Sequence, residues 1–149
     1  MKQPKDVRIL LVEDNPDDVE LTLKCFGKYN VANKIIVARD GEEALKILFN
    51  NQKGVQRQKR PDLILLDLKL PKVDGLEVLC QIKSHPRTQP IPVVILTSSK
   101  EEDDLSNSYK LGVNSYIRKP VNFEEFIEVV RQLGLYWLIL NEPPPKEKE

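Results

Sequence analysis

The sequence has very few residues of the kinds that bind metals through nitrogen or sulfur or that form disulfide bonds. Its 149 residues include one histidine and two cysteines, and Cys25 and Cys80 form no CxxC pair. His85 stands directly before a proline, with no second ligand type nearby. We therefore expect two reduced thiols, and neither a metal site nor a phosphorelay role for the histidine.

Long apolar runs and net charge are also missing. No apolar run approaches the roughly 20 residues that a membrane helix needs, and acidic residues follow the first apolar stretch too soon for a secretory signal. The 23 basic and 23 acidic residues balance, so net charge gives no general reason to bind nucleic acid. These absences predict a cytoplasmic protein that contacts neither membrane nor nucleic acid, and the length suits one domain.

What the chain does contain is a series of apolar runs that alternate with helical patterns. The runs predict strands over residues 7–12, 35–38, 63–66, 93–96 and 115–118. Helical patterns follow them, beginning near residues 15, 40, 75, 99 and 122, and the last reaches about residue 140. Strands that are apolar throughout are typical of a parallel sheet with helices on both faces. We therefore predict an α/β domain of five strands and five helices.

Three of these helices carry start signals. Asn15 should cap the first helix, with Pro16 in its first turn, and Asp40 should cap the second. Ser99, with Glu102 three residues later, should cap the fourth helix as a capping box. Each signal stands shortly after the end of a predicted strand.

Polar side chains break the apolar pattern at one kind of place, directly after a strand. Glu13 and Asp14 follow the first strand, Asp67 the third, Thr97 the fourth and Lys119 the fifth. Ligands of open α/β sheets bind outside the carboxyl ends of strands, where the strand order reverses. In a doubly wound sheet of order 2-1-3-4-5, the first and third strands meet there, which would bring the three acids together.

Three carboxylates in one cleft repel one another unless positive charge compensates. Lys119 and a bound Mg²⁺ ion are the candidates, because Mg²⁺ prefers oxygen ligands and takes one or two carboxylates beside its waters. Asp67 would then be a nucleophile that forms an aspartyl phosphate, with Lys119 and the Thr97 hydroxyl on the phosphoryl oxygens. Each residue taken singly has an ordinary structural explanation, so the prediction depends on their joint placement at strand ends.

Four motifs resemble the receiver domains of two-component response regulators. They are ILLVEDN (9–15), DLILLDLKLPKVDG (62–75), PVVILTSS (92–99) and GVNSYIRKP (112–120). The resemblance extends from residue 7 to about residue 133, and the combination in this order is highly specific. It implies a flavodoxin-like, doubly wound sheet of order 2-1-3-4-5.

The resemblance also implies roles at the metal and phosphorylation site. Asp67 matches the phosphorylated aspartate, and Asp14 matches the direct Mg²⁺ ligand. Glu13 matches an acid that acts through a metal-bound water. The backbone carbonyl of Lys69 matches the third protein ligand.

Further residues match the parts that sense the phosphoryl group. Thr97 and Lys119 match the sensing hydroxyl and lysine, and Tyr116 matches the switch aromatic that turns inward when the hydroxyl moves. The peptide bond between Lys119 and Pro120 matches one that is usually cis. Taken alone, Tyr116 has the ordinary explanation of a core residue.

We therefore predict a single-domain response regulator, not an enzyme, with a receiver domain over residues 1–141 and a disordered tail over 142–149. The tail is too short for an output domain, so a sensor histidine kinase and a downstream protein target are the expected partners. The connection after the second helix and the ending Tyr136-Trp137-Leu138 resemble regulators that partner bacterial phytochrome kinases. From Leu135 onward the last helix is apolar nearly all round, which favours a homodimer interface over extra packing or fraying.

Two alternatives remain open at this point. The basic connection 50–60 is either a solvated loop or a docking surface for a partner. A receiver-like adaptor that binds partners without phosphorylation is the second alternative, although the intact set of acids argues against it. An aspartate-nucleophile phosphatase is disfavoured by Lys69, which stands where that class has a second aspartate, and a dinucleotide-binding module by the lack of GxGxxG after the first strand.

Overall fold

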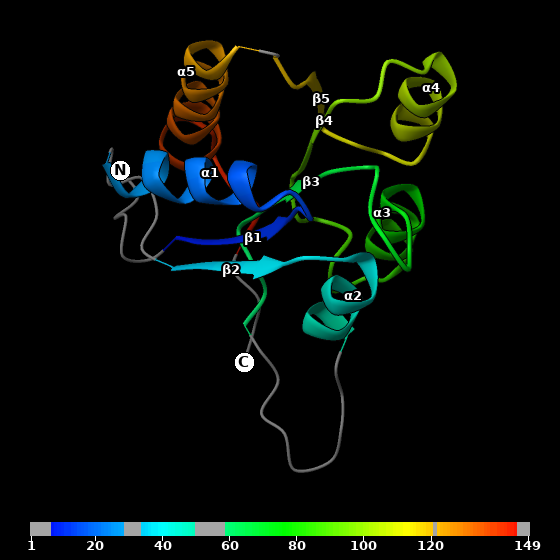
Figure 1. Cartoon of the computed structure of the whole chain (residues 1–149). Helices are drawn as coiled ribbons and strands as arrows, with labels where there is room; N and C mark the ends of the chain where they lie inside the picture. The colour runs from blue at the N-terminus through cyan, green and yellow to red at the C-terminus, as the bar shows by residue number, and fades with distance from the viewer. Residues whose placement is uncertain (1–6, 29–33, 50–58, 121, 146–149) are drawn as a thin grey trace.

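The computed structural model describes residues 7–28, 34–49, 59–120 and 122–145, and they form a five-stranded parallel sheet of order β2-β1-β3-β4-β5. The predicted sheet, order included, is therefore confirmed (Figure 1). The strands are β1 (Arg8–Val12), β2 (Lys34–Ala38), β3 (Leu63–Leu66), β4 (Val93–Thr97) and β5 (Ser115–Arg118).

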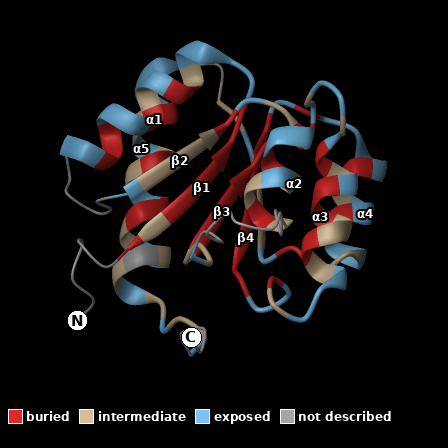
Figure 2. Ribbon diagram, turned by 90° about the horizontal axis from the view of Figure 1, so that it is seen from below, coloured by how far each residue is buried: buried red, intermediate tan, exposed pale blue. Residues whose placement is uncertain are grey.

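Helices lie on both sides of the sheet, and Figure 2 shows buried residues on α1, α2 and α3 where these helices face it. Helices α1 (Pro16–Lys28) and α5 (Phe123–Leu133) share one face. Helices α2 (Gly41–Phe49) and α3 (Gly75–Ser84) pack on the other face, and α4 (Glu102–Lys110) lies beside α3. No described helix combines the length and the apolar character needed to cross a membrane.

The central strand β3 shows why the apolar runs contain no polar positions. All its residues are buried, and successive side chains point to opposite faces of the sheet. Leu63 and Leu65 join the cluster under α1 and α5, whereas Ile64 and Leu66 join the cluster under α2 and α3. Full burial of such a side chain stabilises the fold by about 1.5–3 kcal/mol, so both faces favour apolar residues.

Most of the predicted helix starts are confirmed, and one is wrong. The Asn15 carboxamide accepts from the N–H groups of Asp17 and Asp18, and Asp40 accepts from the N–H of Glu43. Ser99 does not cap α4, which begins three residues later at Glu102. The Ser99 hydroxyl instead donates to the Asp104 carboxylate at 2.6 Å, because a buried acid inside the helix competes for it.

The last helix ends at Leu140, as predicted, but its final turns change their geometry. After α5 the chain continues as a π-helical segment, Gly134–Leu140, in which the N–H of Asn141 donates to the carbonyl of Tyr136. Residues 142–145 follow without helix or strand, and the carbonyl of Pro145 accepts from Arg60 at 2.8 Å. Residues 146–149 and most of the basic connection, 50–58, lie outside the described residues, so the predicted tail and docking role stay predictions.

Gly75 provides a direct test of how tightly the β3–α3 connection is packed. A Cβ atom at Gly75 would lie 2.4 Å from the carbonyl oxygen of Asp67 and 2.5 Å from Cα of Leu68. Because backbone atoms cannot give way as a flexible side chain does, we expect Gly75→Ala to lower the free energy of unfolding by about 2 kcal/mol. Urea denaturation measures this.

Gly27 is the matched control for that substitution. It lies inside α1, and a Cβ atom there would meet nothing within 4 Å. Gly27→Ala should therefore raise the free energy of unfolding, by up to about 1 kcal/mol, because alanine favours the helix. Equal effects of the two substitutions would contradict the tight packing at Gly75.

Candidate functional site

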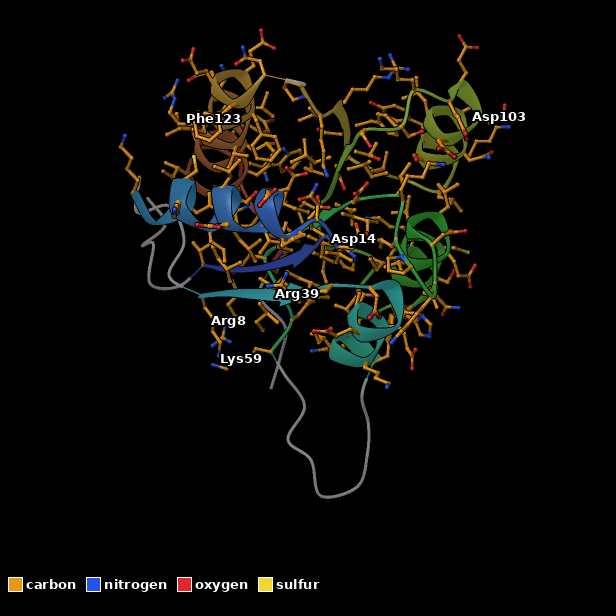
Figure 3. All side chains as sticks on the ribbon, in the orientation of Figure 1. Arg8, Asp14, Arg39, Lys59, Asp103 and Phe123 are labelled. Atoms are coloured by element: carbon orange, nitrogen blue, oxygen red, sulfur yellow. The ribbon has the colours of Figure 1, made fainter. Side chains whose placement is uncertain are left out.

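The acids predicted to form a site meet at the carboxyl edge of the sheet, between β1 and β3. Pairing continues one residue past each strand, because the N–H of Glu13 donates to Ala38 and the N–H of Asp67 donates to Val12. These two carboxylates are only 4% and 5% exposed, whereas Asp14 is exposed. Figure 3 shows Asp14 just beyond the end of β1. One oxygen from each of Glu13, Asp14 and Asp67 lies within 4.8 Å of the others.

Lys119 brings the positive charge into this group. Its ammonium nitrogen lies 2.6 Å from Glu13, 2.8 Å from Asp18 and 3.3 Å from Asp67. The backbone aims the side chain, because the N–H of Lys119 donates to the carbonyl of Thr97 at 2.7 Å, one residue beyond β5. The Lys119 side chain is 10% exposed, so these contacts are weakly screened by solvent.

Burial and neighbouring charges shift the protonation of the pair that makes the shortest contact. Burial raises the pKa of Glu13 to about 7, and the nearby Asp67 charge adds to the rise, while the hydrogen bond from Lys119 opposes it. Burial alone would lower the pKa of Lys119, but the hydrogen bonds to Asp18 and Glu13 outweigh it and raise that pKa. The lysine is therefore firmly charged, and Glu13 titrates near neutral pH.

The donor set fits a hard divalent cation. Three carboxylates with no imidazole or thiolate suit Mg²⁺ or Mn²⁺, and one lysine does not balance their charge. Lys69, whose backbone carbonyl is the expected third ligand, lies on the same loop, where its N–H donates to the Asp67 carboxylate at 3.3 Å. Glu13, Asp14 and Asp67 are the residues that would hold the ion.

Thr97 ends β4, and Tyr116 lies two residues before the end of β5, beside Ile95 of β4. Thr97 is fully buried, and its hydroxyl accepts from the N–H of Ser99 at 3.3 Å. Tyr116 already packs inward against the α2 and α3 side, and its buried hydroxyl has no hydrogen-bond partner among the residues that the structure describes. That burial raises the pKa of Tyr116. The role of Tyr116 as a switch residue therefore stays a prediction.

The β3–α3 loop is also tied to α4. The ammonium of Lys69 lies 3.2 Å from Asp104 and 3.6 Å from Glu101, and Asp104 in turn accepts from Ser99. One buried carboxylate thus joins the loop after Asp67 to the loop after Thr97.

The expected cis bond before Pro120 is absent, since no peptide bond in the described part of the chain is cis. The trans isomer of such a bond is the more stable one by about 0.5–1 kcal/mol. Lys119 reaches its three carboxylates from that isomer, because the hydrogen bond to Thr97 already directs it. The prediction was therefore wrong for this structure.

Asp18 is a member of the site that the sequence analysis missed. Its place in the first turn of α1 suggests only a favourable charge at the start of a helix, yet its carboxylate reaches Lys119. The spacing along the helix could have indicated this role. Asp18 stands four residues before Thr22, so the two share one face of the helix, and Thr22 is buried. An acid in the first turn, on the same face as a buried residue, is therefore a candidate for the site.

The raised pKa of Glu13 predicts that metal binding depends on pH. Mg²⁺ competes with the proton that Glu13 carries below about pH 7. We expect the affinity for Mg²⁺ to be about tenfold weaker at about pH 6 than at about pH 8. Titration with Mg²⁺ at the two pH values, followed by Trp137 fluorescence or calorimetry, measures this.

Glu13→Gln is the control for this dependence, because it removes the titrating group. The variant should bind Mg²⁺ more weakly than the wild type but with little change between the two pH values. A wild-type affinity that is the same at both pH values would contradict the role of Glu13.

Comparison with known proteins gives the same picture. A family model described as the response regulator receiver domain matches residues 9–131. The chain is 44% identical over 136 residues to the probable methanogenesis regulatory protein FilR2 of Methanothrix harundinacea, covering 91% of this chain and 86% of that protein. It is 42% identical over 130 residues to the response regulator Rcp1 of Synechocystis, covering 87% and 88%.

Solved structures agree with the relatives. The Mn²⁺-bound form of Rcp1 superposes with a TM-score of 0.87 at 40% identity, covering 93% of this chain and 99% of that chain. The phosphorylated cyanobacterial phytochrome response regulator RcpA superposes with a TM-score of 0.86 at 41% identity, again covering 93% and 99%. One of these relatives was thus solved with a divalent metal and the other with a phosphoryl group.

Proposed function

Because the chain belongs to the family of response regulator receiver domains, we propose that Asp67 accepts a phosphoryl group from a sensor histidine kinase. Receiver domains are signalling modules of two-component phosphorelays and use Mg²⁺ or Mn²⁺ at an acidic pocket. The proposed domain extends over residues 1–141. The observation that carries the proposal is the meeting of Glu13, Asp14 and Asp67 with Lys119 at one edge of the sheet.

In the proposed reaction a carboxylate oxygen of Asp67 attacks the phosphorus of a phosphohistidine. An O–P bond forms, the P–N bond breaks, and its electron pair leaves with the imidazole of the kinase. Asp14, Asp67, the Lys69 carbonyl and, through water, Glu13 would hold a Mg²⁺ ion, which would supply positive charge next to the transferred group. Lys119 donates to a phosphoryl oxygen from its place 3.3 Å from Asp67.

The signal leaves the site through Thr97 and Tyr116 in the same proposal. The Thr97 hydroxyl shifts toward the phosphoryl group, and Tyr116 occupies the space behind it. Since Ser99 and Lys69 both contact Asp104 of α4, the shift changes the surface formed by α4, β5 and α5. A downstream protein that recognises this surface is the proposed target.

The likeness to the cyanobacterial phytochrome response regulator RcpA supports a phytochrome-type kinase as the partner. The name of FilR2 refers to methanogenesis and not to a phytochrome. The class of kinase is therefore a proposal about this chain. A cytoplasmic location goes with it, because the two cysteines are free thiols, which that compartment keeps reduced.

We also propose a homodimer through the end of the last helix. Tyr136 and Leu140 are 52% and 73% exposed, whereas Trp137 packs partly against the core. Exposed large apolar side chains close together favour contact with another protein surface. Replacing both Tyr136 and Leu140 by serine should reduce the apparent mass toward that of the monomer, as light scattering after gel filtration measures.

Leu23 on α1 is the control for this substitution, because it is also apolar and 37% exposed but lies on another helix. Leu23→Ser should leave the apparent mass unchanged. A wild-type protein that stays monomeric at every protein concentration would contradict the proposed dimer.

The decisive experiment distinguishes the proposed switch from an adaptor that works without phosphorylation. The purified chain is incubated with acetyl phosphate in the presence of Mg²⁺ or of EDTA, and phosphorylation is followed by mass spectrometry and by a shift on phosphate-affinity gels. We expect a hydroxylamine-sensitive acyl phosphate that requires the metal. A chain that stays unmodified with Mg²⁺, by acetyl phosphate and by phosphorylated kinase alike, would overturn the proposal in favour of the adaptor.

A further inference from the structure

Asp18 stands apart from the acids that make up the cation cluster. Its carboxylate lies 2.8 Å from the ammonium of Lys119, closer than Asp67 at 3.3 Å, yet it is not among the three acids whose oxygens converge for an ion. We propose that Asp18 is a positioning residue for phosphoryl transfer, which holds Lys119 in its working orientation while Glu13 serves the metal through water. This inference rests on the proposed function.

The hydrogen-bond donors of Lys119 show why such a partner is needed. An ammonium group has three donors, and here they go to Glu13, Asp18 and Asp67. The ion and Lys119 draw on the same Glu13 carboxylate, so metal binding weakens the shortest of these contacts. Asp18 is the member of this trio that lies outside the cation cluster, and its hold on Lys119 persists.

Asp18 can hold the lysine because its own position is well defined. The Asn15 carboxamide accepts from the N–H of Asp18 at 3.2 Å, and the Asp18 carbonyl accepts from the hydroxyl of Thr22 at 2.7 Å. The next residue, Val19, is buried in the core, and the Asp18 side chain is 21% exposed. A first turn anchored at both ends presents the carboxylate with little freedom.

During transfer, the contact between Asp18 and Lys119 does not have to break. The donor that points to Asp67 is the longest of the three, and it can move to an oxygen of the incoming phosphoryl group. Lys119 then stays tethered to α1 by Asp18 while it stabilises charge on that group. Loss of the tether leaves the lysine charged but less well oriented, which slows transfer without removing the metal site.

Rates of phosphorylation by acetyl phosphate with saturating Mg²⁺ test this role. We expect Asp18→Ala to slow phosphorylation about tenfold, the size seen when a partner that orients a charged group is lost, while the affinity for Mg²⁺ changes less than about twofold. The phosphorylation rate of Asp18→Asn should lie between those of the wild type and Asp18→Ala, because its amide oxygen still accepts a hydrogen bond without the charge. Asp17→Asn is the matched control, since Asp17 is exposed in the same helical turn, and its rate should equal that of the wild type.

A double-mutant cycle with Lys119→Met shows whether Asp18 acts through the lysine. In that background Asp18→Ala should cause no further loss of rate, and the urea midpoints of the four proteins should show coupling between the two residues. Circular dichroism checks that each variant folds. A full tenfold loss in the Lys119→Met background, or an equal loss of Mg²⁺ affinity, would overturn the inference.

Failure of the Asp18 role and failure of the proposed function give different experimental results. If the wild type is phosphorylated and Asp18→Ala is phosphorylated at the same rate, the role of Asp18 is wrong and the proposed function stands. If the wild type is not phosphorylated under any condition, the proposed function fails and the role of Asp18 fails with it, whatever coupling the urea midpoints show.

Discussion

Replacing Asp67 by asparagine should abolish phosphorylation while the fold stays intact. The carboxamide is isosteric, but it lacks the anionic oxygen that attacks phosphorus, so we expect the rate to fall by a factor of about a thousand or more. The variant should still fold, because it removes one charge from a group of acids that repel one another. Phosphate-affinity gels after incubation with acetyl phosphate and Mg²⁺ measure the loss, and thermal unfolding measures the fold.

Asp74→Asn is the control within the same loop. Asp74 caps α3 by accepting from the N–H of Glu77, and asparagine caps about as well. This variant should therefore be phosphorylated like the wild type. If the Asp67→Asn protein is still phosphorylated, another residue accepts the phosphoryl group.

Replacing Lys119 by methionine should have the largest effect on stability. The substitution leaves the buried Glu13 and Asp67 carboxylates without their shared cation, and breaking such a buried ion pair costs about 3–5 kcal/mol. We expect a loss at the lower end, about 3 kcal/mol, because Glu13 can take up a proton. Urea denaturation with and without Mg²⁺ measures it, and the deficit should shrink with the metal, which replaces part of the lost charge.

The same loss should grow as pH rises. Lys119 lowers the pKa of Glu13, so its removal raises that pKa above the value of about 7 in the wild type. The folded variant then binds a proton that the unfolded chain has already released, and its stability falls as pH rises through the raised pKa. Lys24→Met is the control: Lys24 is 72% exposed in a surface pair with Glu20, so the change should stay within about 0.5 kcal/mol. Comparable losses for the two lysines would contradict a buried charge centre at Lys119.

The sequence predicted the sheet well because its strands are buried on both faces. β3 has no exposed position, so an apolar run such as 63–66 is nearly sufficient evidence for a central strand. The acids were placed correctly for a related reason, since residues directly after parallel strands must meet at one edge of the sheet. The strand order itself came from the family resemblance.

The misses depend on contacts between segments far apart in the sequence. Asp18 joins the site through Lys119, which lies 101 residues away, so its spacing to Thr22 can indicate an inward face but not this partner. Ser99 fits a capping box by spacing, but the buried Asp104 takes its hydroxyl and the helix begins later. The isomer of the bond before Pro120 also depends on its surroundings in the fold, whereas the cis prediction came from the family resemblance alone.

Helix α4 is attached to the molecule in an unusual way, because the residues that it buries are Asp104 and Ser108 rather than apolar side chains. Detaching it would expose little hydrocarbon to water, so the heat-capacity change of such an opening should be small and its enthalpy should vary little with temperature. The sheet and the helices that pack on it bury two apolar layers, so their unfolding should have a large heat-capacity change. A van't Hoff plot of the opening of α4 should therefore be close to a straight line, whereas the stability of the whole domain should follow a curved profile with temperature.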